Sequence, residues 1–285
     1  MLDINSFGII GGDKRQLFCA RSMADDGYGV FLTGFDKSGD MLGLKNSDIS
    51  VVINSSDAFI LPLPISKDGI TVFAPFSENS IEISDIIRVI GSKKPVFCGI
   101  NGAVDENTVS SMRLFRYSSR EEFSVANALP TAEGALEIAM REYDGTVSGS
   151  RCIVIGYGRI GRVLSLILKG IGADVTVAAR KIKDREFIRA LGMTPVPVDN
   201  MVGKYDLVFN TVPAMVLDSH TLARIASEAI VIDLASLPGG VDDNAAERMS
   251  IRVFHALSLP GKAAPKTAGI IIKNAVYNII EEEEL

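Results

Sequence analysis

A short segment in the middle of the chain has the residue types and spacing that bind a dinucleotide. An apolar run over 153–155 leads into a G-x-G-x-x-G turn at Gly156, Gly158 and Gly161, and an apolar helix is expected over 163–169. In such a turn the first glycine permits a tight bend, the second lets a pyrophosphate approach the backbone, and the third lets helix and strand touch. The N–H groups at the helix N-terminus then face the anion. The spacing predicts a nucleotide site, and the alternative is a turn that needs glycine only for its geometry.

The end of the next expected strand indicates which nicotinamide cofactor is bound. An acidic residue there would hydrogen-bond the ribose 2′-hydroxyl of NAD, but the sequence reads Ala179-Arg180-Lys181. A guanidinium and an ammonium at this place favour the 2′-phosphate of NADP, with solvated loop charges as the alternative. Arg159 and Ile160, inside the glycine turn, belong to the same predicted site, where Arg159 would lie near the pyrophosphate or point into solvent.

Two further segments follow strands of this expected sheet, at the edge where open α/β sheets bind ligands. They are Asn210-Thr211-Val212-Pro213 and Asp233-Leu234-Ala235-Ser236. The residues predicted to line the cofactor are Asn210, Thr211, Val212, Pro213, Asp233, Ala235 and Ser236. The alternative is ordinary turn chemistry, since Asn, Asp and Ser often hydrogen-bond locally in turns.

Few groups are available to move a proton. Of the two histidines, His220 stands at the start of an expected helix and is predicted to lie at the surface, whereas His255 ends a strand. The predicted catalytic residues are His255, Glu133 and Lys262. For Glu133 the alternative is first-turn helix electrostatics, and for Lys262 it is turn chemistry before a helix. The layout of 2-hydroxy-acid dehydrogenases is not favoured, because Leu237 stands where an arginine is expected.

These residues need a frame of strands and helices, and short Val/Ile-rich runs alternate with helix-length amphipathic segments along the chain. Strands are expected over 7–10, 30–32, 51–53, 71–74, 96–98 and 114–116, and then over 152–155, 174–178, 207–210, 230–233 and 252–254. Helices are expected over 15–26, 80–91, 105–112, 131–143 and 263–280, and a loop over 55–68. The predicted fold class is α/β, with two doubly wound parallel-sheet domains, the second a Rossmann dinucleotide-binding domain, and a ligand cleft between them.

The 285 residues suit two domains. We expect an N-terminal flavodoxin-like substrate domain over 1–126, a connector helix plus Rossmann NADP-binding domain over 127–262, and a C-terminal helix over 263–285 that packs back toward the N-terminal domain.

Composition excludes several classes of protein. No uncharged apolar run reaches the roughly 18 residues that a membrane span needs, and a net charge of −6 leaves no excess of Lys and Arg for nucleic acid. Three well-separated cysteines predict buried thiols rather than disulfides or a metal site. Residues 1–5 include an acid where a secretory leader would be basic, so a cytoplasmic protein is expected.

Several motifs together resemble one family. They are the segments 11–16 (Gly-Gly-Asp-Lys-Arg-Gln), 129–134 (Leu-Pro-Thr-Ala-Glu-Gly) and 259–269, with the glycine turn between them. Over nearly its full length the chain resembles the family of dipicolinate synthase A subunits. The resemblance implies sporulation, the mother-cell compartment and a second, flavoprotein-like subunit. It also implies NADP-dependent oxidation of a dihydro- or tetrahydrodipicolinate, from the lysine pathway, to dipicolinate. A homo-oligomer is expected as well.

A substrate with two carboxylates needs cations in an acidic protein, and arginine grips carboxylates best. The predicted substrate-binding residues are Asp13, Lys14, Arg15, Arg116, Thr131 and Lys266, with helix capping or surface ion pairs as the alternatives. Two other functions stay open. One is a reductase of another small cyclic acid, since shikimate dehydrogenases have an Asn-Thr-x-Pro loop similar to 210–213. The other is a non-catalytic NADP-binding subunit that supports its partner.

Overall fold

The computed structural model describes residues 4–225, 228–236 and 238–285, and the chain divides into two compact units. The first unit combines the chain up to Asn127 with Ala264–Leu285, and the second comprises Ala128–Ala263. Two of the sequence-based expectations fall on residues outside these ranges. They concern Leu237, which stands where a 2-hydroxy-acid dehydrogenase would have an arginine, and residues 1–3 of the N-terminal segment. In the described ranges, no helix is long and apolar enough to cross a membrane.

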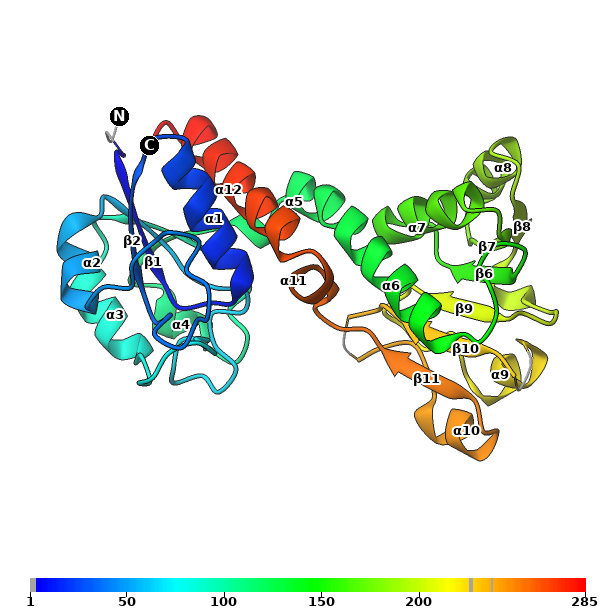
Figure 1. The fold of residues 1–285 in the computed structure, drawn as a ribbon. Helices are drawn as coiled ribbons and strands as arrows, with labels where there is room; N and C mark the ends of the chain where they lie inside the picture. The colour runs from blue at the N-terminus through cyan, green and yellow to red at the C-terminus, as the bar shows by residue number, and fades with distance from the viewer. Residues whose placement is uncertain (1–3, 226–227, 237) are drawn as a thin grey trace. The chain divides into compact units, whose positions relative to one another are not determined.

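The first unit is built on a parallel sheet with the strand order β2-β1-β3-β4-β5 (Figure 1). The strands are β1 (Ser6–Ile10), β2 (Gly29–Thr33), β3 (Ala58–Ile60), β4 (Pro95–Cys98) and β5 (Arg113–Arg116). Most of their side chains are buried because helices cover both faces of the sheet. The strand order reverses between β1 and β3, as in flavodoxin-like folds, and such a switch point is where open sheets bind ligands.

The helices of the first unit form two layers. One core cluster joins the sheet to α1 (Lys14–Asp25), α5 (Glu121–Ala126), the short 3-10 turn η1 (Tyr117–Ser119) and α12 (Pro265–Glu282). The other joins it to α2 (Ile49–Ser55), α3 (Ile83–Ile90) and α4 (Glu106–Val109). Figure 1 shows α12, in red, running beside α1, in dark blue. The helices approach closely because Gly269 has no side chain: a Cβ there would lie 2.5 Å from the Arg15 carbonyl oxygen.

Three expectations for the first unit are wrong. Residues 51–53 do not form a strand but lie in α2, where Val52 and Ile53 turn one helix face toward the core. The expected loop over 55–68 contains β3, which ends before the first proline. The expected strand over 71–74 is an irregular segment in which Thr71 makes a single antiparallel bridge to Glu82. Both wrong strand predictions, over 51–53 and 71–74, rested on β-branched residues. The preference of these residues for strands is weak, and tertiary packing overrides it.

The second unit has a parallel sheet with the strand order β11-β10-β9-β6-β7-β8. The strands are β6 (Arg151–Ile155), β7 (Asp174–Ala178), β8 (Thr194–Val196), β9 (Leu207–Asn210), β10 (Ile230–Asp233) and β11 (Arg252–His255). The short edge strand β8 was not expected, and its Pro195 is tolerated because edge strands leave one side unpaired. The order reverses between β6 and β9, which is the arrangement of a Rossmann domain.

Helices cover both faces of this sheet as well. Alternate residues of β6 point to opposite faces, with Cys152 and Val154 in one core and Ile153 and Ile155 in the other. The first core includes α6 (Ala128–Glu142), α7 (Arg159–Gly170), α8 (Ile182–Ala190) and α11 (Leu259–Ala263), and the second includes α9 (Ser219–Ile225) and α10 (Asp243–Arg248). The predicted class, α/β with two parallel sheets and a Rossmann-type second domain, is confirmed.

Candidate functional site

The glycine turn lies at the carboxyl end of β6, beside the point where the strand order of the second sheet reverses. Gly156 has a φ of 99°, a conformation that L side chains rarely adopt. A Cβ on Gly161 would lie 2.2 Å from the Gly156 carbonyl oxygen, so only glycine lets α7 start so close to the turn. A Cβ on Gly158 would meet no atom of a described residue within 4 Å. The turn is therefore closed on its inner side and open at Gly158.

The first turn of α7 is available to an anion. Gly158 occupies the position before its first residue, and in the described part of the chain no side chain caps this helix end. The unpaired N–H groups of a helix N-terminus carry partial positive charge and bind phosphates. Arg159, exposed, and Ile160, half-buried against the core, belong to this first turn.

A hollow of about 480 Å³ borders the turn. Its lining residues are Gly156, Tyr157, Gly158, Ala178, Ala179, Arg180, Lys181, Asp184, Val198, Thr211, Val212, Pro213, Ala214 and Val216. It thus joins the carboxyl ends of β6, β7 and β9, which lie far apart along the chain. An open, phosphate-ready turn beside a hollow of this size fits one half of a dinucleotide.

Two cations at the end of β7 face this hollow. The side chains of Arg180 and Lys181 are exposed, and neither makes an ion pair with another described residue. Their backbone is held in place because the Arg185 guanidinium donates to the carbonyl oxygens of Ala179, at 3.0 Å, and Arg180, at 2.8 Å. The lining acid Asp184 lies 3.5 Å from the Arg162 guanidinium, which offsets its charge. The hollow is therefore electropositive at this end.

Three of the predicted residues end neighbouring strands in the same register. Asp233 pairs with Asn210 on one side and with His255 on the other. The Asp233 carboxylate is only 1% exposed and accepts hydrogen bonds from the Asn210 amide at 2.8 Å and from the Gly240 N–H at 3.2 Å. His255 is exposed, with Nδ1 3.6 Å from Asp233 Oδ2 and Nε2 2.8 Å from Asp243 Oδ1. Asp233 thus binds protein groups on both sides of its strand.

The buried pair of Asn210 and Asp233 holds the wall of the hollow. Asn210 donates from its amide to the Val212 carbonyl and accepts from the Val212 N–H. Thr211 donates from both its N–H and its hydroxyl to the Ile155 carbonyl. The side chains of Asn210 and Asp233 therefore support the 211–213 loop from behind, whereas the sequence placed them in contact with the cofactor.

The remaining predicted residues of the second unit are more scattered. Ala235 is buried, its N–H donates to Asp233, and Ser236 beside it is exposed. Glu133 on α6 and Lys262 on α11 are exposed, and Thr131 on α6 is buried. In the described ranges no hydrogen bond or ion pair joins His255, Glu133 and Lys262 to one another.

In the first unit, Asp13 and Arg15 form a partly buried ion pair at the start of α1, and Lys14 between them is exposed. Arg116 ends β5 and pairs with Glu106. Lys266, in the first turn of α12, is exposed. The ion pairs of Arg15 and Arg116 mean that neither guanidinium is wholly free for a substrate.

The sequence reasoning missed several groups of this site. Arg162 and Asp184 form their ion pair on α7 and α8, and no spacing rule marks it. Val198 lines the hollow and follows β8. Because the sequence did not predict this strand, it did not predict the position of Val198 either. Gly240 packs so tightly that a Cβ would lie 2.3 Å from the Asn210 amide nitrogen. The Gly-Gly pair after β10 is the sequence feature that could have indicated this close contact.

The three thiols lie outside the site and are buried, as predicted. Burial raises the pKa of Cys19 and Cys98 to about 12 and that of Cys152 to about 11. They are therefore protonated and unreactive at neutral pH. Across the described residues, no cluster of three or more His, Cys, Asp or Glu is placed to hold a metal ion.

Comparisons with known proteins match both units. Residues 6–114 match the family described as the N-terminal domain of the dipicolinate synthase A subunit, and residues 130–246 match the D-isomer specific 2-hydroxyacid dehydrogenase NAD binding domain. The second match shows a nicotinamide dinucleotide domain of the dehydrogenase type.

Proteins similar over the whole length agree. The dipicolinate synthase A subunit of Bacillus subtilis is 31% identical over 99% of this chain and 98% of its own length. The crystal structure of the dipicolinate synthase A subunit from Bacillus halodurans is 31% identical, covers 97% of both chains and has a TM-score of 0.86. That of the Bacillus subtilis protein is 30% identical, covers 100% of this chain and 98% of its own, and also has a TM-score of 0.86. This chain belongs to the family of dipicolinate synthase A subunits.

Proposed function

We propose that this chain is the NADP-dependent oxidoreductase subunit of a dipicolinate synthase, and that it oxidises a dihydro- or tetrahydrodipicolinate to dipicolinate. The observation that carries the proposal is the hollow beside the open Gly158, with the exposed cations Arg180 and Lys181 at its end. The names of the relatives supply the class of product. The dehydrogenase-type domain supports an enzyme that carries out a redox reaction over a subunit that only binds the nucleotide.

Each part of the site has a role in this proposal. The first-turn N–H groups of α7 bind the pyrophosphate, and Arg180 and Lys181 bind the 2′-phosphate of the adenosine half. The 211–213 loop, supported by Asn210, shapes the far wall of the hollow. Bound NADP⁺ would supply the hydride acceptor: loss of one hydride and one proton converts a dihydrodipicolinate to dipicolinate, and a hydroxylated tetrahydrodipicolinate would also lose water. Positioning of the ring against the cofactor supplies much of the rate.

Oxidation of the ring also releases a proton, which a protein base takes up. His255 is the proposed base because it ends a strand of the second sheet beside the buried Asp233 carboxylate, which faces its Nδ1. A carboxylate beside one ring nitrogen fixes the orientation of the imidazole. Glu133 and Lys262 remain the alternative bases, and both are exposed.

The proposal extends to the partner and the setting of the reaction. The names of the relatives identify each of them as one subunit of a synthase, which supports a complex with at least one further subunit. We assign the second subunit to a flavoprotein-like chain, the substrate to a branch of the lysine pathway, and the site of action to the mother cell of a sporulating bacterium. We also expect the chain to form a homo-oligomer.

The test measures cofactor reduction by absorbance, with the purified chain alone and with its partner subunit. We expect the wild-type chain to prefer NADP⁺ over NAD⁺ by on the order of tenfold to a hundredfold, the value of one or two hydrogen bonds to a charged group. Arg180→Asp should lose this preference, whereas Arg189→Asp, the same charge change on an exposed residue of α8 that pairs with Glu186, should keep it. An unchanged preference in Arg180→Asp would refute the placement of the 2′-phosphate.

A second candidate function is a non-catalytic NADP-binding subunit that supports its partner. The observation in its favour is that the three predicted catalytic side chains are exposed and, in the described structure, unconnected to one another. NADP⁺ binding without any reduction, in the presence of the partner and a cyclic dicarboxylate, would favour this function over the oxidoreductase.

A further inference from the structure

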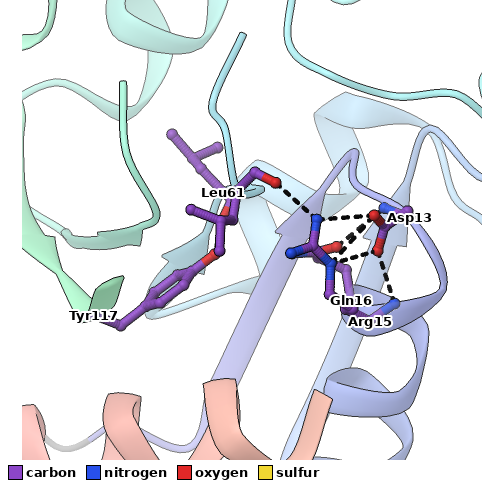
Figure 2. Close-up of polar contacts among 6 residues, drawn as sticks. Asp13, Arg15, Gln16, Leu61 and Tyr117 are labelled. Atoms are coloured by element: carbon purple, nitrogen blue, oxygen red, sulfur yellow. Dashed lines mark hydrogen bonds and ion pairs between the residues drawn. The ribbon is translucent and has the colours of Figure 1, made fainter. Parts of the chain in front are cut away.

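The guanidinium of Arg15 is held on one edge and open on the other. Its Nε and Nη2 groups donate to the Asp13 carboxylate, each at 2.9 Å to the nearer oxygen, and Nη2 also donates to the Leu63 carbonyl at 2.7 Å. Figure 2 shows the Arg15 side chain lying against Asp13. Nη1, with two N–H groups, makes no hydrogen bond to any described residue. The arginine is thus fixed in place with one donor edge unused.

The Arg15 side chain is largely buried, whereas its unused Nη1 remains accessible to a ligand. The Arg15 side chain is 9% exposed. The amide nitrogen of the neighbouring Gln16 is completely buried and makes no hydrogen bond of standard geometry to a described residue, although the Gln16 side chain acts on the Tyr117 hydroxyl and helps to lower its pKa. Buried donors without an acceptor cost free energy, so native proteins rarely keep them unless water or a ligand supplies the acceptor. An accessible guanidinium edge next to this buried amide is therefore suited to a ligand that brings an acceptor.

The two donors lie at the place where this sheet would bind a ligand. Arg15 lies in the first turn of α1, which follows β1, whereas Leu63 follows β3, and the strand order reverses between these two strands. Tyr117, completely buried, donates its hydroxyl to the Leu61 carbonyl and fixes the same loop from the other side (Figure 2). The Arg15 charge acts on this hydroxyl, where it opposes the rise in the pKa of Tyr117 that burial causes.

The helix N-terminus itself does not take the ligand. Asp13 already caps α1 by accepting from the Arg15 N–H, and the Gln16 side chain accepts in return from the Asp13 N–H. This capping box satisfies the first backbone donors of the helix. The Asp13 carboxylate, predicted from the sequence to bind substrate, is instead occupied with the cap and with the guanidinium.

We propose that Nη1 of Arg15 binds one carboxylate of the substrate, and that Asp13 is the positioning residue that presents it. The inference rests on the proposed function and names its substrate anchor in the first unit. A carboxylate is the group that matches a guanidinium edge, and its oxygens supply the acceptor that Nη1 lacks. Because Asp13 and Leu63 hold Arg15 before the ligand arrives, binding orders no long side chain.

The experiment compares two ligands on the full chain by calorimetry: pyridine-2,6-dicarboxylate, and pyridine-2-carboxylate, which lacks one carboxylate. The wild-type chain should bind the dicarboxylate on the order of tenfold to a hundredfold more tightly. In Arg15→Met this ratio should fall close to one, because both ligands then use only the remaining anchor. The matched control is Arg21→Met, which removes the same charge from an exposed position of α1 that pairs with Asp25.

A purely structural arginine gives a different result. If Arg15 serves only to hold the Leu63 loop, Arg15→Met lowers the melting temperature but leaves the ratio of the two affinities at its wild-type value, which overturns the inference. Should Arg15→Met fail to fold, Arg15→Lys keeps a charge beside Asp13 but loses the planar donor edge, and the ratio should fall in the same way. A wild-type ratio in a folded Arg15→Lys protein overturns the inference as well.

Failure of the proposed function is distinguishable from failure of this inference. A wild-type chain that binds neither pyridine carboxylate, while still binding NADP⁺, overturns both the substrate class and the anchor. A wild-type chain that prefers the dicarboxylate, with variants that prefer it equally, overturns the anchor alone.

Discussion

Replacing Gly158 with alanine should remove most of the nucleotide affinity without unfolding the protein. Gly158 has φ −83° and ψ −160°, which alanine adopts without strain, and its added Cβ would meet no atom within 4 Å in the part of the chain that the structure describes. A change of this kind alters stability by less than about 1 kcal/mol. The Cβ does, however, project into the space that a pyrophosphate must enter to reach the N–H groups of α7. The variant therefore separates folding from binding.

The size of the effect follows from the contacts that are lost. A pyrophosphate pushed away from α7 loses about two hydrogen bonds to a charged group, each contributing about 1.5–3 kcal/mol. The loss of about 3 kcal/mol or more corresponds to a rise in the NADP⁺ dissociation constant on the order of a hundredfold or more. Calorimetric titration with NADP⁺ measures it, and thermal unfolding monitored by circular dichroism reports the fold.

Two other glycines of the same helix serve as comparisons. Gly161→Ala places a Cβ 2.2 Å from the Gly156 carbonyl oxygen, so it should lower stability by about 1–3 kcal/mol, the usual cost of overpacking. Gly170→Ala, at the other end of α7, meets nothing within 4 Å and should leave both stability and affinity close to the wild-type values. Wild-type NADP⁺ affinity in Gly158→Ala would refute the placement of the pyrophosphate over this turn.

Three further results are expected. Gly269→Ala should lower the melting temperature, since a Cβ at this crossing of α1 and α12 has no room and costs about 1–3 kcal/mol. The Arg151 ion pair lowers the pKa of Asp206, so its stabilisation is present above about pH 4 and is lost as pH falls through the lowered value. In urea unfolding, Asp206→Asn should thus be less stable than wild type by about 1 kcal/mol at pH 7 and equally stable in strong acid. Asp233→Ala should cost about 3 kcal/mol in the same assay and weaken NADP⁺ binding, because the buried Asn210 amide loses its acceptor; unchanged binding would contradict its supporting role.

The second unit was largely predictable because its signals are local. The glycine turn sits between an apolar strand and an apolar helix, and each step of that pattern has one geometric solution. The strand over 174–178 was predicted at its observed bounds. The three-residue strand β8 was missed because its length and its Pro195 give too weak a pattern.

The first unit was less predictable because its signals depend on tertiary packing. The Ile-Ser-Val-Val-Ile run at the start of α2 has strand composition but packs as a helix, since Val52 and Ile53 share one buried face. In the candidate sites, the residue types were found but not their partners. The sequence predicted Asp13 and Arg15 as substrate-binding residues. It did not predict that they bind each other and leave one edge of the guanidinium open.

The path of the chain through the two units constrains the order in which they form during synthesis. Residues 128–263 are continuous and are complete as soon as they leave the ribosome, whereas the core of the first unit is complete only when α12 adds Ile272 and Val276. At the usual rate of translation this delay is on the order of ten seconds. During that time the nascent first unit exposes the apolar side of α1 that α12 later covers. We therefore expect newly made chains to need protection from aggregation at this surface more than at any part of the nucleotide-binding unit.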